Sequence, residues 1–190
     1  FYNSLMAVLE ETIDGTYADL DFTRIYGSGQ SAGSMATQGF VRTNPEFYAA
    51  AASTSGLAVP DGTSQLPEGA GGAMPDFVIT GQSDLDNLMP DLWGSEMANE
   101  WITYLVDVNN MPDAQIGTAD DEHEFINDRT KVYTWENSDG VPMVKYGYTL
   151  LRAHNCSPYE MPILWDFMEH FSFEKAEDGL SLIHISEPTR

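Results

Sequence analysis

The chain has few basic residues, and this shortage limits the partners that it can have. Only 8 lysines and arginines stand against 30 aspartates and glutamates in 190 residues, which gives a formal net charge of −22. Proteins that bind nucleic acids carry basic patches, so we expect no nucleic-acid partner. An anionic polymer would be repelled for the same reason. Such acidity is compatible with a soluble or exported protein, but it identifies neither a location nor an oligomeric state.

Cysteine, metal-binding spacings and long apolar runs are also scarce. Cys156 is the only cysteine, so no disulfide can form within these residues. No cysteine and histidine residues have the spacing of a zinc site. The glycine cluster at 69–72 lacks the lysine of a phosphate-binding loop. No apolar run is long enough to span a membrane. The sequence therefore predicts no metal, no cofactor and no membrane span.

The first residues have the pattern of a helix that has already begun. The sequence opens at Phe1, and Leu5, Leu9 and Ile13 fall on one stripe of a helix over residues 1–14. A chain that opens inside a helix looks like an internal piece of a longer protein. We therefore expect the true N-terminus, any export signal and several early strands to precede Phe1.

The last residues have a different origin from the rest, on our interpretation. Residues 180–190 resemble, along their whole length, the translation of a transposase-end adapter used in sequencing libraries. Such a segment is set aside from fold prediction, as an engineered scar would be. His184 is then no catalytic candidate. The sequence predicts one domain over residues 1–179, followed by a non-native tail.

Apolar segments with strand character alternate with segments of helical period. This alternation predicts an α/β fold with a mostly parallel sheet and helices on both faces. Residues 131–136 and 142–151 are expected to pair across a turn at Asp139-Gly140, and residues 56–75 form a long loop rich in glycine and proline. The other expected strands are 47–53 and 76–80, and the expected helices are 34–43, 91–108 and 160–173.

The segment Gly29-Gln30-Ser31-Ala32-Gly33 carries the motif G-x-S-x-G between a short strand and a helix. In a nucleophile elbow, this sharp turn raises the serine hydroxyl above the edge of the sheet. A side chain in place of either flanking glycine is expected to collide with the tight backbone. Ser31 is the candidate nucleophile; the plainer interpretation is a serine in a turn.

An acid and a histidine follow Ser31 in the order that α/β-hydrolases use. Asp84 lies just beyond the strand at 76–80, and Asp86 is the competing choice two residues later. Either could instead be an ordinary turn aspartate. His154 lies just beyond the strand at 142–151. Because a histidine takes the serine proton and an acid orients that histidine, these residues form a candidate catalytic triad.

The remaining histidines fit the site less well. His123 lies in the acidic run 120–124, which we expect to be a solvated loop. His170 lies on the last expected helix, four residues after Asp166, and a surface ion pair accounts for it. His154 is therefore the candidate base.

At this point the sequence resembles the poly(3-hydroxybutyrate) depolymerase group of esterases, which includes feruloyl and acetylxylan esterases. The resemblance lies in residues 21–52, with Pro45-Glu46-Phe47 after the elbow helix, and in residues 153–167. The group commonly has glycine where Ser34 and Ala153 stand. The resemblance implies an α/β-hydrolase fold, a small-molecule or polymer-linked ester as substrate, and no cofactor. It also implies that Ser31 is the nucleophile, Asp84 the orienting acid and His154 the base.

An oxyanion hole completes the predicted chemistry. The Ala32 backbone N–H is one candidate donor, and the resemblance places the second donor on a loop upstream of Phe1. We therefore expect little activity from the 190 residues alone. Two other functions remain open: an oligopeptidase-type serine hydrolase, and a binding domain that kept the fold and lost catalysis.

Overall fold

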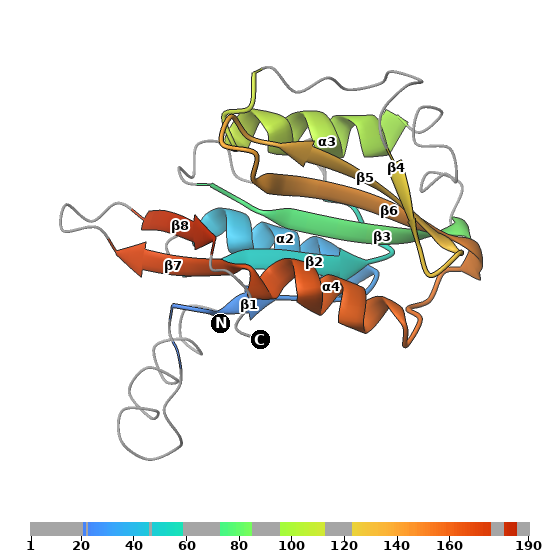
Figure 1. Cartoon of the computed structure of the whole chain (residues 1–190). Coiled ribbons are helices and arrows are strands. Elements are labelled where there is room, and N and C mark those ends of the chain that lie inside the picture. The colour runs from blue at the N-terminus through green and yellow to red at the C-terminus, as the bar shows by residue number, and fades with distance from the viewer. Residues whose placement is uncertain are drawn as a thin grey trace, which may run out of the picture.

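The computed structural model describes residues 21, 23–45, 47–58, 73–84, 96–112, 123–175 and 181–185. Its centre is a six-stranded sheet in the order β1-β2-β3-β6-β5-β4 (Figure 1). The strands are β1 (Tyr26–Gly27), β2 (Ala50–Thr54), β3 (Asp76–Ser83), β4 (His123–Ile126), β5 (Thr130–Glu136) and β6 (Pro142–Ala153).

The sheet is parallel at one side and antiparallel at the other. Strands β1, β2, β3 and β6 pair in parallel, whereas β5 pairs antiparallel with both β6 and β4. All residues of β2 are buried, as expected of a parallel strand covered on both faces. The β5–β6 hairpin turns at Gly140, whose φ of 76° favours glycine. The predicted pairing across Asp139-Gly140 is confirmed.

Helices cover both faces of this sheet. In Figure 1, α4 (Glu160–Glu169) lies in front of the sheet and α2 (Ala32–Thr43) behind it. Helix α3 (Glu96–Val108) shares the face of α2, because Trp101 on α3 donates a hydrogen bond to Gln38 on α2. On the α4 face, the rings of Phe77 and Phe167 pack edge to face. The predicted arrangement of helices on both faces is confirmed.

Two predicted segments take a different form. The last helix ends at Glu169 instead of continuing to 173, and Phe171–Lys175 forms β7. Phe171 follows Phe167 at helical spacing, and the centroids of the two rings lie 5.1 Å apart although Phe171 is in a strand. The spacing of apolar residues therefore could not show that the helix ends before Phe171. The acidic run 120–124 was expected to be a solvated loop, but its last two described residues open β4. Pairing of β4 with β5 overrides its weak strand pattern.

Several predictions concern residues outside the described ranges. These are the helix at 1–14, most of the loop at 56–75, the start of the helix at 91–108, Asp86, and residues 186–190. Within the adapter-like tail, Ser181–Ile185 forms β8, which pairs antiparallel with β7 through its backbone.

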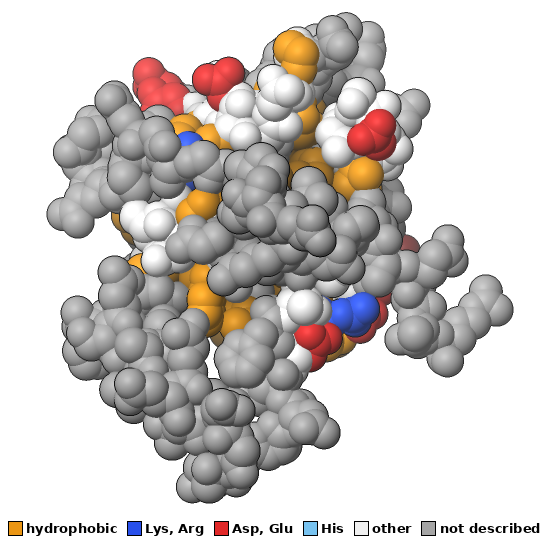
Figure 2. Space-filling view, turned by 90° about the vertical axis from the view of Figure 1, so that its left-hand side faces the viewer, with side chains coloured by type: hydrophobic (Ala, Val, Ile, Leu, Met, Phe, Trp, Pro, Cys, Tyr) orange, Lys and Arg blue, Asp and Glu red, His pale blue; other side chains and the backbone are white. Residues whose placement is uncertain are grey.

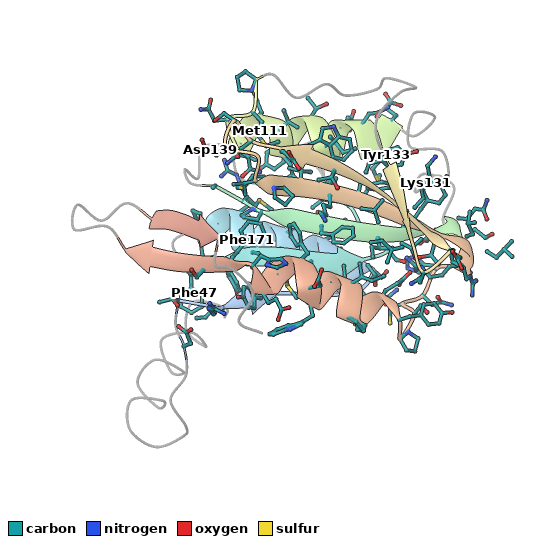
Figure 3. The ribbon with its side chains drawn as sticks, in the orientation of Figure 1. Phe47, Met111, Lys131, Tyr133, Asp139 and Phe171 are labelled. Carbon is teal, nitrogen blue, oxygen red and sulfur yellow. The ribbon has the colours of Figure 1, made fainter. Side chains whose placement is uncertain are left out.

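The surface of the described residues shows how the negative charge is distributed. Figure 2 shows acidic side chains at several separate places on one face, with few basic side chains among them. At the sheet, the carboxyl ends of β3 and β6 reach the same edge, at the right of Figure 1, where the chain turns back into α4. The β5–β6 turn, with Asp139, lies at the opposite end of these strands, and Met111 lies near it (Figure 3).

Candidate active site

Ser31 occupies a strained turn between β1 and α2. Its φ of 58° and ψ of −123° lie in a region that side chains disfavour, at a cost of about 1–3 kcal/mol. The turn is held by the Ser31 backbone N–H, which donates to the Thr54 carbonyl at 3.0 Å. Serine at a helix N-cap usually accepts a hydrogen bond from the first turn, but the Ser31 side chain caps nothing. The fold therefore leaves this hydroxyl available for another partner.

Glycine is needed at two places around this turn. A Cβ on Gly29 would lie 2.3 Å from the Gly33 carbonyl oxygen, and a Cβ on Gly56 would lie 2.3 Å from the Ser31 carbonyl oxygen. Both contacts are with backbone atoms, which cannot move aside cheaply. A Cβ on Gly33, by contrast, would meet nothing within 4 Å. The expected collision is thus correct for Gly29 and wrong for Gly33, because Gly33 lies on the exposed side of α2.

The free hydroxyl of Ser31 meets His154, which comes from the loop after β6. His154 Nε2 lies 2.7 Å from Ser31 Oγ, and His154 Nδ1 lies 2.6 Å from Asp84 Oδ1. A carboxylate only accepts hydrogen bonds, so Nδ1 carries the proton and donates a hydrogen bond to Asp84. In that neutral tautomer, Nε2 accepts from the serine hydroxyl. The arrangement can draw a proton from Ser31.

The acid and the histidine of this site differ in burial. The Asp84 side chain is fully buried, while 30% of the His154 side chain is exposed. Asp84 follows β3 directly, and its Oδ2 also accepts from the Gly81 backbone N–H at 3.2 Å. The acid is therefore fixed and shielded from water, and the imidazole edge is open to a substrate.

The other predicted residues lie in different places. Ala32 is the first residue of α2, where backbone N–H groups have no partner within the helix. Asp86 lies outside the described residues. His123 begins β4, the strand at the other side of the sheet from β1, and His170 is the residue that follows α4. Of the sequence candidates, the structure brings Ser31, Asp84 and His154 together.

A buried amide network beneath the elbow was not predicted from the sequence. Gln38 Nε2 donates to the Ser34 hydroxyl at 2.9 Å and to the Gly56 carbonyl at 2.8 Å. Gln38 Oε1 accepts from Trp101 Nε1 and from the Ala58 backbone N–H. Every polar atom of this side chain thus has a partner. The network ties α2 to the segment that supports Ser31, and it gives Ser34 a role.

Below the acid, a second buried pair involves Tyr146 and Thr80, whose hydroxyl oxygens lie 2.8 Å apart. Burial raises the pKa of Tyr146 well above its usual value, so its hydroxyl stays neutral. A neutral phenol adds no charge to the surroundings of Asp84.

The described part of the chain offers no group of three or more histidine, cysteine, aspartate or glutamate residues that could hold a metal ion. Among the same residues, no helix has the length and apolar character needed to cross a membrane.

No protein-family profile matches the chain, and no curated protein matches it in sequence. Among solved structures, it is similar to SOBER1 from Arabidopsis thaliana and to a point variant of SOBER1, each at 16% identity with a TM-score of 0.50. The similarity covers 88% of this chain, but only 61% of the variant chain and 60% of the SOBER1 chain. At this identity the likeness establishes the fold. The predicted α/β-hydrolase fold is confirmed, and the chain spans about three fifths of the length of these structures.

Proposed function

We propose that this chain is part of a serine hydrolase that cleaves carboxylic esters through an acyl-enzyme. One observation carries the proposal: His154 bridges Ser31 Oγ and Asp84 Oδ1, at 2.7 and 2.6 Å, within a strained turn that frees the serine hydroxyl. A fold alone does not imply a function, so the proposal depends on this site. The catalytic domain would extend over residues 1–179, with residues 180–190 as a non-native tail.

The proposed reaction has two steps. His154 Nε2 takes the proton from Ser31 as the serine oxygen attacks the ester carbonyl, and the protonated imidazole then gives this proton to the leaving alcohol. Water next attacks the acyl-serine ester and passes a proton through His154 back to Ser31, which releases the carboxylic acid. Asp84 stabilises the imidazolium in both steps and keeps the proton on Nδ1 in the resting state.

The oxyanion formed in each step needs donors that are already in place. The Ala32 N–H at the start of α2 supplies one, and the positive end of the helix dipole adds to it. We propose that the second donor belongs to a loop upstream of Phe1. The substrate is a small-molecule or polymer-linked ester, in particular a polyester or an ester attached to polysaccharide, as in the esterase group that residues 21–52 and 153–167 resemble.

The test compares substrate classes on the complete gene product. Short nitrophenyl esters, feruloyl esters and peptide anilides would be offered to the wild type and to Ser31→Ala. We expect ester hydrolysis that is lost in Ser31→Ala. Faster cleavage of anilides would instead favour an oligopeptidase-type enzyme. A folded wild type that cleaves none of them would favour a binding domain without catalysis.

A further inference from the structure

Arg152 is a buried charge two residues before His154, and neither step of the proposed mechanism uses it. It is 5% exposed and lies near the end of β6. Its Nη2 donates to the Ile79 carbonyl on β3 at 2.8 Å, and its Nη1 donates to the Ser55 hydroxyl at 2.7 Å. Nη1 also donates to the Asn155 carbonyl. One guanidinium thus contacts the middle of β3, the residue that follows β2 and the loop that carries His154.

Glu160 holds the other side of the same loop. This wholly buried residue opens α4, and its Oε1 lies 2.8 Å from Arg152 Nε. The same oxygen accepts from the Thr149 hydroxyl at 2.5 Å, and Oε2 accepts from the Ser157 backbone N–H at 3.0 Å. His154 therefore lies on a short loop that Arg152 holds at Asn155 and Glu160 holds at Ser157, and these two side chains form one buried ion pair.

The arginine also reaches the segment that supports the nucleophile. Ser55 follows β2, between Thr54, whose carbonyl accepts from the Ser31 N–H, and Gly56, which packs against the Ser31 carbonyl. The Ser55 backbone N–H donates to the Ile79 carbonyl, the acceptor that Arg152 also uses. Ser55 has a φ of 56°, so this support is itself a strained turn. Arg152 therefore donates hydrogen bonds both to the loop that carries His154 and to Ser55, in the segment that supports Ser31.

We propose that Arg152 and Glu160 are positioning residues that set the distance between Ser31 Oγ and His154 Nε2. The inference rests on the proposed function and names side chains that neither the motif nor the triad includes. Neither residue touches the reacting atoms; both act by fixing the loop that carries His154. Alignment of this kind matters because a displacement of about 1 Å can cost about 10²-fold in rate.

The energetics favour positioning over stabilisation as the reason for this pair. Burial lowers the pKa of Arg152, and the charges of Glu160 and Asp84 oppose that shift without cancelling it, so the buried pair keeps part of its desolvation cost. Apolar residues of similar volume often stabilise a protein as well as a buried ion pair does. An ion pair with several directed hydrogen bonds adds geometry that an apolar contact lacks.

The main test uses the double variant Arg152→Met/Glu160→Gln in the complete gene product. It removes both buried charges, so neither is left unpaired, and the glutamine amide can still contact Thr149 and Ser157. We expect a folded protein with kcat reduced about 10²-fold and a nearly unchanged KM, because substrate contacts are intact. Arg42→Met is the matched control, since Arg42 is also buried but lies at the far end of α2 from Ser31. This control should keep its kcat even if its stability falls.

A second variant covers the case in which the double variant does not fold. Ser55→Ala removes the hydroxyl that joins the segment after β2 to Arg152 and to the Asn155 carbonyl, and it leaves both charges paired. We expect a decrease in kcat of about 10-fold with KM unchanged. A folded double variant with kcat within about two-fold of the wild type would overturn the proposal, and so would the same result in Ser55→Ala if the double variant fails to fold.

Amide hydrogen exchange separates this proposal from the proposed function. In the double variant, the Asn155 amide and its neighbours in the loop after β6 should exchange faster, because Arg152 no longer holds the Asn155 carbonyl, while amides of β2 and β3 keep their protection. Unchanged exchange in that loop would overturn the positioning role whatever the activity. A wild type without Ser31-dependent turnover would instead overturn the proposed function, and the exchange result would still decide whether the pair holds the loop.

Discussion

At the scale of the residue, Ser31 shows what a short motif can and cannot predict. The motif identified the serine, and the strand and helix around it predicted a turn. The φ of 58° and the free hydroxyl follow from contacts with Thr54 and Gly56, which lie in a distant part of the sequence. The motif also treated Gly29 and Gly33 as equivalent, although the turn encloses Gly29 against the Gly33 backbone and leaves Gly33 open.

The two motif glycines give a matched pair of variants. Gly33→Ala should raise the free energy of unfolding by up to about 1 kcal/mol, because alanine favours a helix and the space is open. Gly29→Ala should lower it by about 1–3 kcal/mol, because its Cβ would overlap the Gly33 carbonyl. Urea denaturation of both variants measures the difference. Equal effects in the two would contradict the described turn.

The acid of the site can be tested without changing its shape. Asp84→Asn should reduce kcat by about 10⁴-fold, as the same change does in serine proteases, because an amide can hold the imidazole in the wrong tautomer. Asp139→Asn is the control, since Asp139 lies in the β5–β6 turn at the opposite edge of the sheet (Figure 3). Steady-state ester hydrolysis measures both. Retention of most activity in Asp84→Asn would exclude Asp84 as the orienting acid.

Asp76 predicts how stability depends on pH. It is wholly buried at the start of β3, and burial raises its pKa well above the usual value, against the opposing effect of the Phe77 N–H. Folded protein therefore holds this proton more tightly than unfolded protein does. Its contribution to stability is complete below the unfolded pKa of about 3.9 and is lost as the pH rises toward the raised value.

Asp76→Asn should remove the loss of stability at higher pH, because an amide does not ionise. We expect the variant to be more stable than the wild type at pH 7, and the advantage should shrink toward pH 4. Thermal unfolding across this range measures it. A variant less stable than the wild type at pH 7 would show that the carboxylate form is favoured in the fold.

At the scale of the element, strands and helices were easier to predict than their ends. The helix expected at 34–43 is observed as α2 from Ala32, and the strand expected at 76–80 continues to Ser83. Asp84 and His154 could be found because each follows a strand with a clear apolar pattern. Arg152 and Glu160 could not, since an ion pair between β6 and α4 depends on how the elements pack. The available sequence signal was Arg152 itself, a charged residue that directly follows the apolar pair Leu150-Leu151.

The packing of α2 against α3 yields a prediction of its own. Gln38→Met should leave the Trp101 Nε1 and the Ala58 N–H without their buried partner, whereas the Gly56 carbonyl keeps the Ser34 hydroxyl. Each such group costs about 1–3 kcal/mol, so stability should fall by several kcal/mol. Chemical denaturation measures the loss, with Thr103→Ala on the exposed side of α3 as the control. A loss no larger than in the control would contradict the network.

At the scale of the whole molecule, the described sheet corresponds to part of the length of the structures that it resembles. The chain spans 60–61% of the SOBER1 chains that it resembles in structure. Among the described residues, the nucleophile, base and acid candidates are in contact, and the Ala32 backbone N–H is the candidate oxyanion donor. An acidic chain with net charge −22 also repels anionic substrates, which is consistent with an uncharged ester.

The proposed upstream oxyanion donor predicts a difference in turnover between the 190 residues alone and the complete gene product. The 190 residues alone should hydrolyse esters at least about 10²-fold more slowly than the complete gene product, because the loss of one oxyanion donor typically costs that much. Nitrophenyl ester turnover of both proteins, each checked for folding by circular dichroism, measures the ratio. Equal turnover would show that the upstream region supplies no donor.

The most direct test of the central claim is to label the complete gene product with a fluorophosphonate and to locate the adduct by peptide mass spectrometry. The account predicts one phosphonyl group on Ser31, absent in Ser31→Ala and formed far more slowly when His154 is replaced by alanine. A folded protein that takes up no label, or that carries it on another residue, would contradict the claim that His154 activates Ser31.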